Sequence, residues 1–421
     1  MCNKRNTLII NFRSFLNVGG IETYLYDLSK YLVNNGGRVI WLCHNIPLVA
    51  KSFSDLMLSD KIERVAVKEG LYWYKCEKLN ISDEENAIIV SFSPLTNSMA
   101  EKMWKKMGCP SNIYPLYIIA NNVGEGYYLE ENFKFFLKNY VKSKMCQICK
   151  RWEENNTIRF FALSHISSLE DKYGIKISNH QTKLLKSVDN FNPLDLSIIK
   201  IRASRDNFNI VTVGRFDFPH KGYMLGLVRS YGRLKRRFPK LNLTIIGYGP
   251  HEKELLAEIS NIPIEYRSDI KIVGEVAPSD LVIYFNKAHL NVSVAGAASQ
   301  GARYGLLTLP ARNFCTGECE VYGYFSENAL KTTSLCEGYL VDNFIEEVIN
   351  MPDDEYIRRS VACYEALVKR DSNTSEPLYL FNSVSSLKSR ASFCFSDTLF
   401  ILFISYCIKV INRLACLLKI H

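Results

Sequence analysis

The sequence predicts an α/β protein built from two doubly wound domains, and three observations support this prediction. The chain opens with a short apolar run at Thr7 to Phe12, a glycine turn, and a segment with helical spacing at Ile21 to Val33. A second strand-like run, Arg38 to Cys43, follows. Strand, glycine turn, helix and strand form the repeating unit of a parallel sheet. The same rhythm restarts at Phe208 to Val213 after a polar stretch, which indicates a second domain of the same class.

Further apolar runs extend both domains. Two more strands are expected in the first domain, at Ala87 to Phe92 and Tyr117 to Ala120. In the second domain we expect a helix from about Met224 to Arg237 and a strand at Leu243 to Ile246. The polar stretch from Leu184 to Asn207 is typical of a hinge. The predicted domains are therefore residues 1–190 and 205–385.

Residues 393–421 form a third predicted segment, an amphipathic tail. Leu399 to Ile404 is wholly apolar, and the residues after it divide into a polar stripe and an apolar face at helical spacing. A spanning helix needs about 20 apolar residues, and a cation at mid-bilayer costs about 2.5–3.5 kcal/mol. A membrane-associating helix at the interface is therefore favoured over a span. A terminal helix packed on the protein's own domains would show the same pattern.

Composition limits the classes of function. With 421 residues, 47% of them hydrophobic, global disorder is excluded. The net charge of +9 favours anionic partners, but no nucleic-acid recognition module is present, so we predict no nucleic-acid partner. Thirteen dispersed cysteines and a start without an apolar signal core indicate reduced, cytoplasmic thiols. Cys146 and Cys149 have metal-ligand spacing without a second pair, so no metal site is predicted.

The most specific motif lies at the start of the second domain, in IVTVGRFDFPHKGYMLGLVRSYGRLKRRFPKLNLTIIGYGP. A predicted strand ends at Gly214, Arg215 follows at once, and Lys221 precedes a predicted helix. Cations at the carboxyl end of a strand and beside a helix start suit a diphosphate, because helix amides add to the side-chain charge. The alternative is a strand-end arginine with a solvated lysine.

This stretch resembles the retaining GT-B glycosyltransferases of family four. The resemblance continues through IIGYGP, IVGEV and LVIYFNKAHLNVSVAGAASQGARYGLLTLPA, in the expected order over roughly half the chain. It implies two Rossmann-like domains facing a cleft, with the first binding the acceptor and the second a nucleotide-diphosphate sugar, a substrate rather than a cofactor. It also implies that Arg215 and Lys221 hold the donor diphosphate as the catalytic pair, with Gly214 beside them.

The chain departs from the family at the donor sugar. Two glutamates eight positions apart are usual there, and the matching positions are Val292 and Gln300. Gln300 has a donor and an acceptor for a ribose hydroxyl, whereas Val292 has neither. The sugar is then expected to meet the backbone amides at the following helix start. These donor-binding candidates are Gly296, Ala297, Ala298 and Ser299.

The resemblance also implies a glycine loop that faces the cleft. Gly19 and Gly20 form a turn into a helix that carries Glu22, although a Gly-Gly turn is more often only a tight connection. Many relatives place a histidine after the strand at Tyr117 to Ala120, where this chain has Asn121 and Asn122. No general base is predicted, and no metal is required where an arginine and a lysine neutralise the leaving group.

Two basic and aromatic stretches, Glu101 to Gly108 and Phe133 to Trp152, suggest contact with an anionic membrane. An ordinary surface helix with a solvated lysine face fits the second stretch as well. The predicted function is a hexosyltransferase that adds a sugar to a lipid-linked saccharide or glycan in bacterial-type surface polysaccharide assembly. It would be peripheral on the inner face of the cytoplasmic membrane. The alternatives are a non-catalytic GT-B relative that binds or scaffolds, and a nucleotide-sugar epimerase on the same fold.

Overall fold

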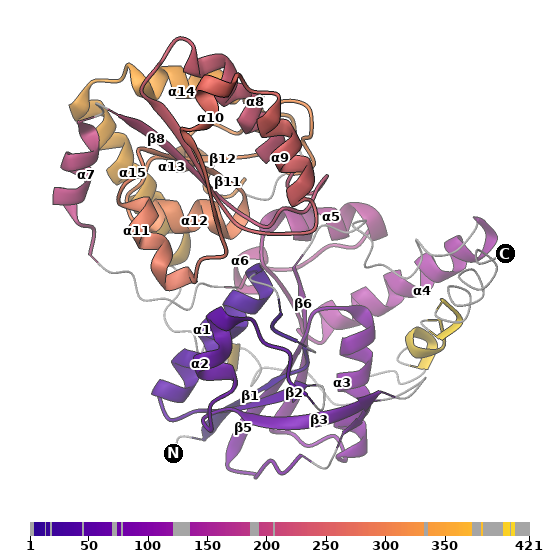
Figure 1. Cartoon of the computed structure of the whole chain (residues 1–421). Coiled ribbons are helices and arrows are strands. Elements are labelled where there is room, and N and C mark those ends of the chain that lie inside the picture. Colours follow the sequence, from indigo (N-terminus) through magenta and orange to yellow (C-terminus); the bar gives the residue numbers. More distant parts are fainter. Residues whose placement is uncertain are drawn as a thin grey trace. The chain divides into compact units, whose positions relative to one another are not determined.

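The chain divides into two compact units in a computed structural model (Figure 1). The first unit comprises residues 1–188 and 374–421, and the second comprises residues 189–373. The structure describes residues 4–12, 14–16, 19–43, 46–69, 74–76, 79–120, 135–185, 193–204, 207–331, 336–372, 380–381, 399–404 and 406–408.

A seven-stranded sheet forms the centre of the first unit, in the order β4-β3-β2-β1-β5-β6-β7. The strand β4 pairs antiparallel with β3, and the other pairs are parallel. The strands predicted from the sequence are confirmed as β1, β2, β5 and β6. The bounds are β1 (Arg5–Ile10), β2 (Arg38–Cys43), β3 (Glu63–Glu69), β4 (Tyr74–Cys76), β5 (Glu85–Ser91), β6 (Ile113–Ile119) and β7 (Ile158–Phe160).

Helices cover both faces of this sheet because its strands are apolar on both faces. Leu8 and Ile10 of β1 pack with helix α1, whereas Ile9 packs in a separate cluster with Trp104 of helix α3. A third cluster lies between β6, β7 and helices α4 and α5. The helices are α1 (Gly20–Asn34), the short 3₁₀ turn η1 (Lys51–Phe53), α2 (Ser54–Met57), α3 (Pro94–Lys106), α4 (Phe135–Glu154), α5 (Leu163–Tyr173) and α6 (His180–Lys183).

The second unit has a five-stranded parallel sheet in the order β10-β9-β8-β11-β12. Its strands are β8 (Phe208–Val213), β9 (Leu241–Ile246), β10 (Ile270–Gly274), β11 (Leu290–Ser293) and β12 (Thr308–Pro310), and β13 (Glu320–Val321) and β14 (Tyr339–Leu340) form a separate antiparallel pair. Its helical segments are α7 (Leu196–Ala203), α8 (Tyr223–Lys235), α9 (Glu252–Ser260), α10 (Ile264–Arg267), η3 (Pro278–Asp280), α11 (Leu281–Phe285), α12 (Ala295–Arg303), α13 (Phe325–Asn328), α14 (Val341–Ile349) and α15 (Asp353–Ser372). The helix and strands predicted here are confirmed.

In each sheet, the direction in which the chain adds successive strands reverses once. In the first unit the chain runs from β1 outward to β2 and β3, then returns to β5 and runs outward to β6 and β7 on the other side. In the second unit it runs from β8 to β9 and β10, then returns to β11 and β12. Open α/β sheets bind ligands beyond the carboxyl ends of the strands at such a switch point. The two places to search are therefore β1–β5 and β8–β11.

The stretch predicted as a hinge contains a helix, α7, that belongs to the second unit. Its Arg202 is buried and donates from Nη2 to the carbonyl of Tyr304 at 2.8 Å, so a residue that suggested a polar linker is instead bonded inside the unit. At the other boundary, Leu380 and Phe381 are fully buried in the core of the first unit. The chain has therefore left the second unit before residue 385, the end that the sequence predicts.

The described part of the tail packs on the protein. Ile401 and Ile404 are buried in the cluster formed with α4 and α5, and the ring of Phe400 lies 5.9 Å from that of Tyr140. This arrangement favours the alternative of a terminal helix packed on the protein's own domains over a free interfacial helix. Residues 393–398, 405 and 409–421 lie outside the described residues. Of the helices that the structure describes, none combines the length and the apolarity needed to traverse a bilayer.

Candidate functional site

The β8–β11 switch point of the second unit brings together two segments that the sequence predicted to bind the donor. Gly214 and Arg215 follow β8 directly, and α12 begins two residues after the end of β11. A hydrogen bond from the Val213 amide to Ser293 Oγ, 3.0 Å long, joins the ends of the two strands. Ser293 Oγ donates in turn to Asn291 Oδ1 at 2.7 Å. This edge of the sheet is thus held in one arrangement before any ligand arrives.

Arg215 is held in place by an acidic neighbour two residues away. Its Nη2 lies 2.5 Å from Asp217 Oδ2, and about a third of its side chain is exposed. Partial burial opposes ionisation of Asp217, but the guanidinium prevails and lowers the pKa of that carboxyl below its usual value. Among the described residues, Nε and Nη1 of Arg215 have no hydrogen-bond partner, so N–H groups on these two nitrogens remain for an anion.

Lys221 points back to the end of β8. A Cβ at Gly214 would lie only 3.4 Å from Lys221 Nζ, so the ammonium reaches the strand terminus. Burial, reinforced by the charge of Arg215, lowers the pKa of Lys221 to about 8. In the part of the chain that the structure describes, Nζ has neither a hydrogen bond nor an ion pair. A partly desolvated ammonium without a partner is unfavourable, and a diphosphate would supply a negative charge for it.

The glycines of IIGYGP position the turn that carries Arg215. Gly247 has φ of +151°, and a Cβ there would stand 1.9 Å from the carbonyl oxygen of Gly214. A Cβ at Gly249 would stand 2.4 Å from the carbonyl oxygen of Phe216. The two backbones therefore approach more closely than any side chain allows. The motif that the resemblance singled out is required for the geometry of the cation pair, although it contributes no charge.

The start of α12 offers fewer amides than the sequence predicted. The amides of Ala297 and Ala298 both donate to the carbonyl of Val294, at 3.2 and 3.4 Å, and the Ala298 side chain is buried in the core. Ser299 lies further along the helix, and its Oγ is bonded within the unit. Gly296 is exposed, and its amide alone among those four candidates stands in the first turn without a carbonyl partner in the described structure.

Val292 lies inside β11 rather than in a donor loop. It pairs with Leu309 of β12 and is fully buried in the main core of the unit. A carboxylate at this position would be buried among apolar side chains, which explains why the position is valine in this fold. Gln300, the other departure, is partly exposed on α12.

The glycine loop of the first unit is less suited to phosphate than the sequence suggested. Gly19 is the residue before α1, and Gly20 is its first residue. Glu22 folds back over this start, since a Cβ at Gly19 would lie 2.5 Å from its Oε2. A carboxylate there satisfies the positive end of the helix dipole itself. Asn121 and Asn122 lie outside the described residues.

Sequence analysis did not single out the aromatic rings at the carboxyl ends of this sheet. Phe12, Phe92 and Phe161 follow β1, β5 and β7, and all three are partly buried. The ring centroids of Phe12 and Phe92 lie 5.7 Å apart, those of Phe92 and Phe161 6.5 Å, and those of Phe161 and Tyr24 5.1 Å. An aromatic residue within two positions of the end of each of three strands was the available signal.

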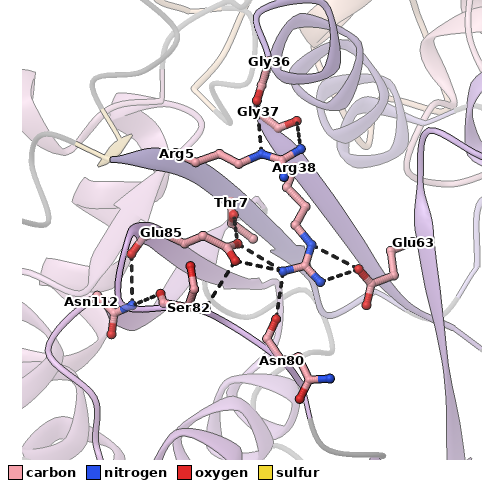
Figure 2. Close-up of polar contacts among 10 residues, drawn as sticks. All are labelled: Arg5, Thr7, Gly36, Gly37, Arg38, Glu63, Asn80, Ser82, Glu85 and Asn112. Atoms are coloured by element: carbon pink, nitrogen blue, oxygen red, sulfur yellow. Dashed lines mark hydrogen bonds and ion pairs between the residues drawn. The ribbon is translucent and has the colours of Figure 1, made fainter. Parts of the chain in front are cut away.

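A charged cluster lies at the opposite edge, where the strands begin (Figure 2). Arg38, the first residue of β2, bonds Glu63 of β3 at 2.5 Å and Glu85 of β5 at 3.1 Å. Glu85 also accepts from Thr7 Oγ1 at 2.5 Å and from the Ser82 amide at 3.2 Å. Burial raises the pKa of Glu85, but these hydrogen-bond donors outweigh burial and lower that pKa below its usual value. The amino ends of parallel strands are not where such sheets bind ligands, so this cluster ties strands together.

A described histidine, His165, lies near the carboxyl ends of β6 and β7, the region where the sequence resemblance placed a histidine in many relatives. It is almost fully buried, and burial lowers its pKa to about 4 despite a hydrogen bond to the Ile119 carbonyl. It is therefore neutral at pH 7 and inaccessible to a substrate. Across the described residues, no three histidine, cysteine or acidic side chains gather as a metal site requires.

Comparison with known proteins shows the fold. No protein-family model and no curated protein matches the sequence. Among solved structures, HepE of Anabaena in complex with UDP and glucose aligns with a TM-score of 0.55 at 11% identity, over 91% of this chain and 100% of that one. The trehalose-6-phosphate synthase OtsA aligns with 0.54 at 12% identity, over 92% and 100%. Sucrose-phosphate synthase from Thermosynechococcus elongatus gives 0.52 at 13%, over 87% and 95%. The chain has the GT-B fold of these glycosyltransferases.

Proposed function

We propose that this protein is a glycosyltransferase that uses a nucleoside-diphosphate sugar as donor. The observation that carries the proposal is the cation pair at the β8–β11 switch point. Arg215 and Lys221 converge there beside the start of α12, and the Lys221 ammonium has no anionic partner within 4 Å among the described residues. HepE, which shares the fold, was solved in complex with UDP and glucose, and this supports a nucleoside diphosphate as the ligand.

The proposed chemistry follows from the charges. As the sugar leaves the donor, negative charge develops on the diphosphate, and fixed cations at that position stabilise it without a metal. Arg215 is oriented by Asp217 and can present two nitrogens to the phosphate oxygens. Lys221 contributes a point charge close to Gly214. Retention of anomeric configuration is part of the proposal and is supported by the sequence resemblance.

We further propose that the acceptor is a saccharide or lipid-linked glycan and that the enzyme is peripheral on the inner face of the cytoplasmic membrane. Support comes from one surface of the first unit. Tyr140 on α4 and Leu399 and Phe403 in the tail are each more than half exposed, and Lys142 is exposed one turn beyond Lys138 on α4. Exposed apolar side chains with neighbouring lysines suit an anionic lipid surface. Co-sedimentation with vesicles of anionic and of neutral lipid tests this part.

Calorimetric titration with a panel of nucleoside diphosphates and their sugars tests the donor site. Arg215→Ala and Lys221→Ala are each expected to weaken binding about tenfold to a hundredfold, the loss of one charge-assisted contact to phosphate. Lys240→Ala is the matched control, because Lys240 is exposed immediately before β9, at the opposite edge of the same sheet.

The outcomes separate the candidate functions. Donor binding together with sugar transfer to an acceptor supports the proposal, and the anomeric coupling in the product reports retention. Donor binding without transfer, across a broad acceptor panel, would favour the non-catalytic relative, whereas isomerised donor without acceptor would favour an epimerase. If no nucleotide binds, or if the Arg215 and Lys221 variants bind as the wild type does, the donor site is elsewhere.

A further inference from the structure

A short segment after β12 runs along the edge of the sheet that carries the proposed donor site. Ala311 follows β12 directly, and its amide donates to the carbonyl of Ser293, the last residue of β11, at 2.9 Å. Three residues on, the amide of Phe314 donates to the carbonyl of His220 at 2.9 Å. His220 immediately precedes Lys221 in the chain. The segment is thus fastened at one end to the strand termini and at the other to the turn that carries Lys221.

Phe314 adopts a backbone conformation that its side chain disfavours. Its φ is +60°, in the left-handed region, where a bulky residue is rarely found. Ala295, the first residue of α12, is also left-handed, with φ of +48°. Two strained residues that are not glycine therefore lie at the same edge of the sheet, one after β12 and one after β11. Strain of this kind is typical of segments that bind ligands.

Asn313 lies between the two fastened ends of the segment, and its polar groups are unused. Its side chain is only 7% exposed, and its Oδ1 is buried. Among the residues that the structure describes, neither Oδ1 nor Nδ2 of Asn313 has a hydrogen-bond partner. A buried carboxamide in this state destabilises the free protein, because it has lost contact with water without forming new hydrogen bonds. Such a group calls for a partner, which a ligand or a bound water can supply.

The chemistry of the carboxamide selects the partner. Oδ1 accepts hydrogen bonds, whereas the phosphates of a nucleotide sugar are ionised and have no hydrogen to donate, so a hydroxyl group is the complementary ligand. The sequence resemblance placed a carboxylate for the donor sugar at position 292, but Val292 is buried inside β11 and cannot provide one. Asn313 follows the neighbouring strand, β12, at the same edge of the sheet. It is therefore a candidate for the missing contact to the sugar.

We propose that Asn313 binds a hydroxyl group of the donor's sugar and thereby contributes to the choice of donor. The inference rests on the proposed transferase function and adds to it a residue that contacts the substrate. Almost no solvent reaches Oδ1 in the free protein, so the turn at Phe314 opens when the nucleotide sugar binds. The disfavoured conformation of Phe314 makes this movement less costly, because leaving it relieves strain. Only a donor that carries its sugar forms the new hydrogen bond.

The test compares the nucleotide sugar that binds most tightly with its nucleoside diphosphate, and the readout is the ratio of their dissociation constants from calorimetry. Asn313→Ala is expected to weaken binding of the nucleotide sugar about threefold to tenfold, the loss of one hydrogen bond, and to leave the affinity for the diphosphate unchanged. Asn313→Asp keeps an acceptor oxygen but adds negative charge, so it should weaken both ligands together and preserve the ratio. Monodeoxy sugar nucleotides identify the hydroxyl, since the analogue that lacks it should bind the wild type and Asn313→Ala equally.

Ser360→Ala is the matched control. Ser360 Oγ is also buried and, in the described part of the chain, without a partner, but it lies on α15. This variant is expected to leave both dissociation constants unchanged. If Asn313→Ala leaves their ratio unchanged, whether both affinities fall or only the melting temperature does, the amide serves the nucleotide or a bound water; the inference is then wrong and the proposed function stands. If the wild type binds neither nucleoside diphosphates nor their sugars, both fail.

Discussion

Protonation of Lys221 should control donor affinity between pH 7 and pH 9.5. Its pKa in the free protein is about 8, because burial and the charge of Arg215 disfavour the ammonium. At pH 7 about 90% of the protein then carries a charged Lys221, and at pH 9.5 only about 3% does. A bound diphosphate favours the ammonium and raises its pKa. The affinity should therefore fall about thirtyfold over this range, or about 2 kcal/mol.

The shifts of the neighbouring groups lie away from the middle of this window. Arg215 stays charged throughout. The pKa of Asp217 is lowered below its usual acidic value, so this carboxyl is ionised throughout the range, and the pKa of His220 is lowered by burial and by Lys221, which favours the neutral imidazole. Burial raises the pKa of the Cys315 thiol, which keeps that group protonated through most of the range. The second ionisation of a phosphate is also essentially complete above pH 7.

Calorimetry with the tightest-binding nucleoside diphosphate, repeated across this range, measures the effect. Lys221→Arg is the decisive control, because a guanidinium does not titrate and its affinity should stay constant. Proton uptake of about half a proton on binding near pH 8, measured in buffers of different ionisation enthalpy, is the independent readout. A wild-type affinity that is constant to pH 9.5, or an Arg variant that loses affinity as the wild type does, would refute the reasoning.

Three further predictions address the supports of the site and the fold. Asp217→Asn removes the ion pair that orients Arg215 and is expected to weaken donor binding about threefold to tenfold with little change in the melting temperature, as calorimetry and thermal unfolding will show. Gly247→Ala, which places a Cβ 1.9 Å from the Gly214 carbonyl, should abolish donor binding or folding, whereas the same change at the exposed Gly296 should be tolerated in thermal unfolding. The pKa of Glu85 is lowered, so its ionised carboxylate stabilises the fold above the ordinary pKa near 4.5, and this stabilisation is lost as the pH falls further. Glu85→Gln should therefore lower the free energy of unfolding by about 1–3 kcal/mol at pH 7, as denaturant unfolding will measure. The deficit should be smaller below pH 4, and donor binding should be unchanged.

The parts of the fold that could be predicted from sequence are those whose signal is local. The apolar run at Arg38–Cys43 is buried along nearly its whole length, and its bounds match β2. The start of β6 was missed by four residues, because Pro115 interrupts the pattern expected of a strand while pairing in register with Ile89. Helix α7 was missed because Arg202, which suggested a polar linker, donates to the carbonyls of Phe285 and Tyr304, which are far away in the sequence.

The features of the candidate site also differ in whether their sequence signal is local. The position of Arg215 and Lys221 between β8 and α8 could be predicted because their spacing relative to one strand and one helix is encoded within a few residues, whereas their role stays a prediction. The position of Val292 could not, because counting residues does not show how far β11 continues before α12 begins. The aromatic edge of the first unit depends on strands that are distant in the chain, so the closeness of Phe12 and Phe92 emerges only from the sheet order.

A crystal structure of the protein with a bound nucleoside diphosphate tests the central claim most directly. The account predicts that the diphosphate lies beyond the carboxyl end of β8, with phosphate oxygens within hydrogen-bonding distance of both Arg215 and Lys221 Nζ. A diphosphate bound elsewhere, with Arg215 still paired only to Asp217 and Lys221 without an anionic contact, would contradict it.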